Sequence, residues 1–251
     1  MTNGNIDVIL YYEYKKGCAK PFLRRHMLDY KVIRSRRKTA AIYIREDGSV
    51  EVRCPLNYSA GGIERFVSDN REKLEILSAK RAAEDQKRKA FKVKEQDSLR
   101  LMGKEYPLIK TGGNKASFDG KAFYLPQKLW EEEAKHALVK LYKSLAKEII
   151  GKKVEHFSKI MDLKPGRISI NSAKSRWGSC GAKDSLNFSW RLIRAKEECL
   201  DYVIIHELAH IKHRNHSPYF WNLVAEYCPG YKRAKALLFE EQKRLACENW
   251  D

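Results

Sequence analysis

The sequence predicts an α+β protein, in which a basic, β-rich N-terminal part with one long helix precedes a small, mainly helical domain. Polar and apolar side chains alternate in several short runs before Pro126, and this period of two is typical of strands. After Pro126 apolar residues recur mostly at helical spacing, as in helices packed on a core. We therefore divide the 251 residues into an N-terminal region, 1–126, and a C-terminal domain, 127–251.

Strands and one long helix are predicted in the N-terminal region. The alternating runs span residues 30–34, 41–45, 50–53, 98–109 and 116–125. The dipeptide Asp47-Gly48 predicts a hairpin turn between the second and third runs. The basic run Arg34–Lys38 either contacts phosphates or forms a solvated loop. Residues 59–93 are predicted to form one helix, because an apolar stripe begins after Ser59 and thins beyond Lys80.

Helices dominate the prediction for the C-terminal domain. A long helical pattern covers residues 129–161, and short strands are predicted at 167–170 and 186–190. Ser217-Pro218 is typical of a helix start, since serine caps the free N–H groups and proline fits the first helical position. A last amphipathic helix is predicted over residues 231–247.

The segment His206-Glu207-Leu208-Ala209-His210 is the most informative part of the chain. Residues four apart share one face of a helix, so His206 and His210 can bind one metal ion. Two neutral imidazoles, a third ligand and an open position form the usual hydrolytic zinc site. Glu207 is placed to contact a water on the ion and to take its proton as general base. The plain alternative is a buried helix whose histidines are only hydrogen-bonded, but ionisable groups in a core need a reason.

Three residues compete to be the third ligand. His216 follows His210 by six positions, and Asn215 can turn the chain there because asparagine tolerates the left-handed conformation. His213 shares the face of His206 if the helix continues, but it would then be collinear with the other two ligands. Glu226 on the next helix is the remaining candidate. We expect His216 to be the ligand, with one zinc ion per chain.

Composition limits the classes of partner. The net charge of +18 favours polyanions such as nucleic acid or nucleotides, or it only keeps the protein soluble. The start of the chain has no apolar run of the signal-peptide type, and no segment approaches the ~20 apolar residues that span a bilayer. We therefore expect a cytoplasmic protein with no membrane contact, whose six scattered cysteines are reduced.

Several motifs together resemble one known family. They are Arg176-Trp177-Gly178-Ser179-Cys180, Asn187 in the following strand, His206–His210 and Asn215–Trp221. This set resembles the YgjP-like metallopeptidases, relatives of the WLM and SprT-like zinc proteases, and the likeness covers roughly residues 30–245. It implies a zincin-like catalytic domain with His206, His210 and His216 as zinc ligands and Glu207 as catalytic base.

The expected function is a cytosolic zinc-dependent hydrolase, foremost a metallopeptidase acting on peptides or proteins, including proteins bound to nucleic acid. Arg176 is expected to stabilise a developing oxyanion, and the strand at 186–190 to pair as an edge strand with extended substrate. One alternative is a nucleotide phosphohydrolase, with phosphates held near Lys174 and Arg176. Another is a nucleic-acid-binding protein with a structural zinc, although such sites have four protein ligands and would leave Glu207 without a role.

Overall fold

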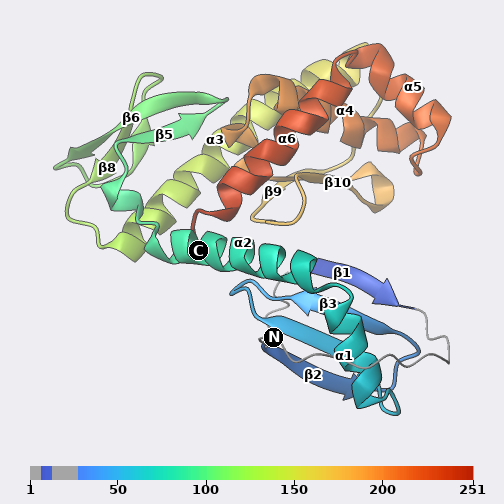
Figure 1. The fold of residues 1–251 in the computed structure, drawn as a ribbon. Helices are drawn as coiled ribbons and strands as arrows, with labels where there is room; N and C mark the ends of the chain where they lie inside the picture. The colour runs from blue at the N-terminus through green and yellow to red at the C-terminus, as the bar shows by residue number, and fades with distance from the viewer. Residues whose placement is uncertain (1–6, 13–27, 251) are drawn as a thin grey trace. The chain divides into compact units, whose positions relative to one another are not determined.

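The computed structural model describes the backbone of residues 7–12 and 28–250, and it confirms the α+β class (Figure 1). The chain forms two compact units, the first ending at Phe91 and the second beginning at Lys92. The expected boundary at Pro126 therefore falls inside the second unit, and as a boundary between functional domains it stays a prediction.

The N-terminal unit is a four-stranded sheet with two helices. Its elements are β1 (Asp7–Tyr12), β2 (Tyr30–Ser35), β3 (Ala40–Ile44), β4 (Val50–Pro55), α1 (Ala60–Ser68) and α2 (Arg71–Ala90). The strand order is β1-β3-β4-β2, and β2 runs parallel to β4 while the other pairs are antiparallel. The predicted turn joins β3 to β4, where Gly48 has a φ of 85° that glycine adopts easily. Ile42 and Val52 of the sheet and Phe66 and Leu74 of the helices share one apolar core.

The prediction of a single helix over residues 59–93 is wrong, because the helix is interrupted at Asn70. The side-chain amide of Asn70 donates to the backbone oxygen of Phe66 at 2.8 Å. The backbone oxygen of Asn70 accepts from the N–H of Leu74 at 3.0 Å. Asn70 thus ends α1 with its side chain and starts α2 with its backbone. An asparagine side chain that competes with the helix backbone does not alter the spacing of apolar residues, so the sequence pattern does not predict this interruption.

Part of the basic run Arg34–Lys38 serves the fold. The guanidinium of Arg34 donates to the backbone oxygens of Leu56 at 3.2 Å and Tyr58 at 2.5 Å. These bonds hold the loop that follows β4, so Arg34 is already engaged within the unit. A phosphate contact by the rest of the run stays a prediction.

The C-terminal unit carries the motifs of interest. Its elements are η1 (Val93–Glu95), β5 (Ser98–Leu101), β6 (Lys104–Thr111), β7 (Ser117–Phe118), β8 (Phe123–Pro126), α3 (Glu131–Ile160), β9 (Ile168–Asn171), β10 (Gly178–Cys180), η2 (Ala182–Asp184), β11 (Leu186–Ser189), η3 (Trp190–Arg194), α4 (Glu197–Lys212), α5 (Pro218–Tyr227) and α6 (Tyr231–Ala246). The sheet that contains β5, β6 and β8 lies at one end of the long helix α3, and α5 and β10 lie toward the other end (Figure 1).

The strand expected over residues 98–109 is in fact a hairpin. Met102 and Gly103 have φ values of 52° and 74° and turn the chain between β5 and β6. The N–H of Met102 donates to the backbone oxygen of Ile193 at 2.7 Å. A Cβ on Gly103 would lie 2.9 Å from the Cα of Lys196, so only glycine fits. The hairpin is thereby attached to the segment that precedes α4.

The second sheet of this unit has the order β10-β11-β9. Strand β11 pairs with β10 antiparallel and with β9 parallel. The expectation that residues 186–190 form an edge strand for substrate is therefore wrong, because both edges of β11 are occupied. Strand β10, which contains Gly178 and Cys180, is the edge strand on that side.

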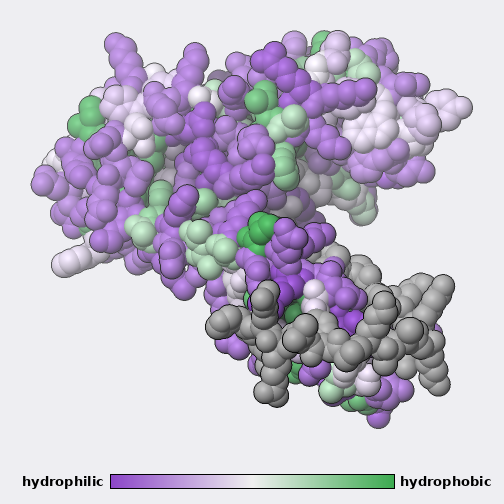
Figure 2. Space-filling view, in the orientation of Figure 1, coloured by the Kyte–Doolittle hydropathy of each residue, from purple (hydrophilic) through white to green (hydrophobic). Residues whose placement is uncertain are grey.

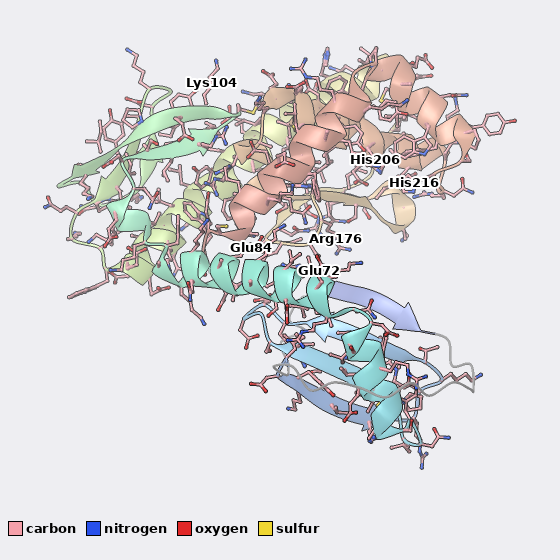
Figure 3. All side chains as sticks on the ribbon, in the orientation of Figure 1. Glu72, Glu84, Lys104, Arg176, His206 and His216 are labelled. Carbon is pink, nitrogen blue, oxygen red and sulfur yellow. The ribbon has the colours of Figure 1, made fainter. Side chains whose placement is uncertain are left out.

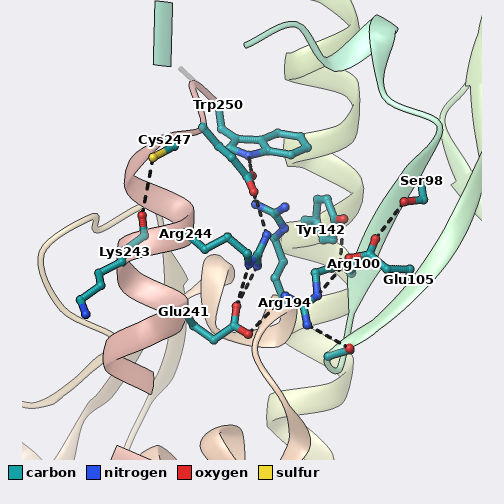
Figure 4. A network of polar contacts seen from close by, with 12 residues as sticks. Ser98, Arg100, Glu105, Tyr142, Arg194, Glu241, Lys243, Arg244, Cys247 and Trp250 are labelled. Atoms are coloured by element: carbon teal, nitrogen blue, oxygen red, sulfur yellow. Dashed lines mark hydrogen bonds and ion pairs between the residues drawn. The ribbon is translucent and has the colours of Figure 1, made fainter. Parts of the chain in front are cut away.

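A polar network joins the end of the chain to the core of the C-terminal unit (Figure 4). Arg194, which is 3% exposed, donates to the carboxylate of Glu248 at 2.5 Å. The indole N–H of Trp250 donates to the same carboxylate at 2.6 Å. Trp250 in turn packs edge-on against Tyr142 of α3. Glu248 and Trp250 are therefore part of the core around the helices.

Hydrophilic side chains cover most of the face shown in Figure 2, in line with the mean hydropathy of −0.60. Within the described residues, none of the helices has the length and apolar character needed to cross a bilayer.

Candidate metal centre

Helix α4 crosses the interior of the C-terminal unit. Glu197 and Glu198 lie in its first turn, where negative charge is favourable beside the helix N-terminus. The residues before the motif are almost all buried. The helix ends at Lys212, and the next residue, His213, is extended, with a φ of −128° and a ψ of 103°. The apolar residues thus hold α4 in the core. The face of the helix that carries His206 and His210 is directed toward the turn that follows.

Three histidine side chains converge at the end of α4. His206 and His210 come from the helix, and His216 comes from the turn before α5; Figure 3 labels His206 and His216. Each offers a ring nitrogen, and these nitrogens lie within 4.8 Å of one another. The Nε2 atoms of His206 and His216 are 3.1 Å apart. Among the described residues, these three side chains are the one group of three or more His, Cys, Asp or Glu side chains with such an arrangement. We call them the histidine cluster.

The geometry and chemistry of this histidine cluster fit a metal ion. Ligand bonds of about 2.0–2.1 Å in a tetrahedron separate two donor nitrogens by about 3.3 Å, close to the 3.1 Å between His206 and His216. The Nδ1–H of His210 donates to the backbone oxygen of His213 at 3.1 Å, which leaves Nε2 of His210 with its lone pair. Burial and the rings of His210 and His216 lower the pKa of His206 to about 3. The ring of His206 is therefore neutral, as a ligand must be.

Glu207 points away from the helix interior toward strand β10. Its carboxylate accepts a hydrogen bond from the backbone N–H of Cys180. A Cβ on Gly178 would lie 2.7 Å from Cγ of Glu207, so the strand approaches closely because Gly178 has no side chain. Glu207 is 7% exposed, and burial raises its pKa to about 7, against the opposing effects of the Cys180 N–H and the positive charge of Arg176.

The other sequence candidates lie outside the histidine cluster. His213 contributes its backbone oxygen to His210, and its ring stacks on Tyr219 with 6.4 Å between centroids. Glu226 is exposed on α5 and bonds to Tyr227. Arg176 is exposed in the loop before β10, and its charge lowers the pKa of Glu207.

Sequence reasoning missed Arg214, which fastens the turn that carries His216. Its guanidinium donates to Sγ of Cys180 at 3.3 Å and to the backbone oxygen of Gly181 at 3.2 Å. It also forms an ion pair with Asp184. The turn that carries His216 is thereby tied to the segment that follows β10. Nothing in the sequence pairs Arg214 with Asp184, since 30 residues separate them.

Comparison with known proteins identifies the family. Residues 38–241 match the model of the YgjP-like metallopeptidase domain. The chain belongs to the YgjP-like metallopeptidase family. It is therefore a metal-dependent hydrolase of peptides or proteins, and its family implies a divalent metal ion. No curated protein matches the chain.

Two solved structures resemble part of this YgjP-like chain. The crystal structure of the metallopeptidase zymogen of Pyrococcus abyssi abylysin is 28% identical, with a TM-score of 0.35, and the match covers 40% of this chain and 97% of that one. The metallopeptidase zymogen of Methanocaldococcus jannaschii jannalysin is 24% identical, with a TM-score of 0.34, over 38% of this chain and 96% of that one.

Proposed function

We propose that the protein is a zinc-dependent peptidase in which His206, His210 and His216 hold one metal ion and Glu207 is the general base. The observation that carries this proposal is the convergence of three imidazole nitrogens within 4.8 Å, with a buried carboxylate one residue away from His206. Zinc, when bound, supplies the Lewis acidity that polarises a carbonyl and makes a water acidic at neutral pH.

The residues around Glu207 suit proton transfer. The Cys180 N–H holds one side of the carboxylate, and the close contact with Gly178 limits the movement of the side chain. A carboxylate oxygen of Glu207 takes the proton of the attacking water and returns it to the nitrogen of the leaving amine. Arg176, whose charge acts on Glu207, is proposed to favour the developing negative charge on the substrate oxygen.

Two variants test the proposal. Glu207→Gln keeps the shape of the side chain but cannot take a proton, so zinc content should stay at one per chain while casein hydrolysis falls by at least ~100-fold. His206→Ala should lose most of the zinc. Metal is measured by elemental analysis of the purified proteins, and folding by circular dichroism.

The same assays separate the alternative reactions. Wild-type protein is incubated with casein, with nucleoside triphosphates and with DNA. Loss of zinc in Glu207→Gln would make Glu207 a ligand and contradict its role as base. Turnover of nucleotides without any proteolysis would replace the peptidase with a phosphohydrolase. A nucleic-acid partner for the +18 charge stays a prediction.

A further inference from the structure

Aromatic rings of α5 contact every member of the histidine cluster. The ring of Phe220 lies 4.8, 4.6 and 4.7 Å from the rings of His206, His210 and His216. The next residue, Trp221, stacks on His216 with 5.5 Å between centroids and an interplanar angle of 25°. Trp221 also lies 5.9 Å from the ring of His206. Helix α5 starts at Pro218, two residues after His216. Phe220 and Trp221 therefore lie in its first turn, close to His216.

Among the described residues, a hydrogen bond from the outer nitrogen orients only one of the three imidazoles. A ligand histidine usually donates this N–H to a carboxylate or a backbone oxygen, which fixes the ring. His210 does so through the oxygen of His213. The buried Nδ1 of His206 has no hydrogen-bond partner in the described part of the chain. His216 is exposed, and its contact with His206 is made by Nε2, the nitrogen that faces the proposed metal ion, and not by the outer nitrogen. Packing must therefore supply the orientation that hydrogen bonds do not.

Trp221 is itself held in place by further rings. Its other stacking partner is Tyr231 at the start of α6, with 5.3 Å between centroids and an angle of 22°. Tyr231 stacks on Tyr202 of α4 at 6.4 Å and 24°. Tyr202, only 6% exposed, lies one helical turn before His206. A continuous column of rings thus connects the exposed His216 to the buried part of the helix that carries the other two histidines.

We propose that Trp221 is a positioning residue of the metal centre, which orients His216 by ring stacking and restrains His206 by a tilted ring contact. This inference rests on the proposed ligand set. Phe220 is fully buried, and its removal would disturb the core. Trp221 is only partly buried, so its contribution to metal binding can be separated from its contribution to folding.

The test is the affinity of the purified, metal-free protein for Zn²⁺, measured by competition with a chromophoric chelator. Removal of an outer partner of a metal ligand typically costs 10–100-fold in affinity, so Trp221→Ala should weaken Zn²⁺ binding by at least ~10-fold. Trp221→Phe keeps a ring that can stack on both neighbours and should stay within ~3-fold of wild type. Tyr219→Ala is the matched control, because Tyr219 is 73% exposed and stacks on His213 outside the cluster; it should bind Zn²⁺ like wild type.

A second comparison shows whether Trp221 acts through the histidine. In a His216→Ala background, the further loss from Trp221→Ala should shrink, because the main stacking partner is gone. If Trp221→Ala lowered the affinity for Zn²⁺ equally in both backgrounds, or did not lower it at all, the positioning role would be overturned. A wild-type protein that binds no Zn²⁺ would instead overturn the ligand set itself. Thermal unfolding of the metal-free variants checks that each one is folded.

Discussion

Single residues decide how Glu207, the proposed base, is held, and Gly178 is the clearest case. Its φ lies outside the left-handed region, so the backbone accepts alanine without strain, but the added Cβ would lie 2.7 Å from Cγ of Glu207. Glu207 must then shift. Because a misplacement of about 1 Å can cost ~100-fold in rate, we expect Gly178→Ala to lower kcat by about 10–100-fold while zinc content is unchanged.

The matched control for this substitution is Gly151→Ala in α3, where nothing lies within 4 Å of the new Cβ. Alanine is favoured over glycine in a helix by roughly 0.5–1 kcal/mol, so this variant should be slightly more stable and fully active. Steady-state kinetics and denaturant unfolding measure both effects. Full activity of Gly178→Ala would show that Glu207 is not held by its contact with β10.

At the scale of elements, Arg214 joins the turn after α4 to the turn after β10. Lys183 and Asp184 have φ values of 54° and 55°, a conformation that costs of order 1 kcal/mol per non-glycine residue. Such a turn persists only where its surroundings hold it, and the ion pair of Asp184 with Arg214 is one such restraint. Arg214→Ala should therefore raise amide hydrogen exchange in both segments, residues 180–185 and 213–217.

Arg233→Ala serves as the control for that experiment. Arg233 also pairs with a carboxylate, Glu198 at 3.5 Å, but its side chain is 77% exposed, and exposed pairs contribute little. In Arg233→Ala, amide hydrogen exchange should therefore change only on α6, near the substitution. If Arg214→Ala accelerated exchange in its own turn and left residues 180–185 as in wild type, the two turns would be independent.

At the scale of the whole C-terminal unit, the buried ion pair of Arg194 and Glu248 attaches the segment after α6 to the core. Burial alone would raise the pKa of Glu248, but Arg194 and the Trp250 N–H hold this pKa below its usual value. Removing one partner of a buried pair costs about 3–5 kcal/mol because it leaves an uncompensated charge. Glu248→Gln should lower the free energy of unfolding at pH 7 by that amount.

The same pair predicts how stability depends on pH. A carboxyl group whose folded pKa is depressed stabilises the fold above its unfolded pKa of about 4.3, and this contribution is lost as pH falls through the folded pKa. Denaturant unfolding from pH 7 to pH 3 should therefore show a smaller acid loss in Glu248→Gln than in wild type. Glu148→Gln is the control, because Glu148 pairs with Lys152 on the surface. Parallel profiles for wild type and Glu248→Gln would contradict the assignment.

Local chemistry explains which features the sequence alone determined. The spacing of His206 and His210, the Ser217-Pro218 start of α5 and the Asp47-Gly48 hairpin depend on interactions within a few residues, and the structure places each where the pattern predicts. The α+β class follows from the same periodicities. These predictions succeed because helix faces and tight turns are set by backbone geometry.

The tertiary structure decided everything that depends on partners distant in sequence. The central position of β11 follows from pairing on both of its edges, which an alternating pattern cannot reveal. The break at Asn70 is a local exception, because its side chain bonds to the backbone only four residues away, and the apolar pattern does not register such a bond. The contacts of Glu207 with Gly178 and of Arg214 with Asp184 join elements that are far apart in the sequence. Only packing brings such groups together, because no local rule of geometry specifies which elements will meet.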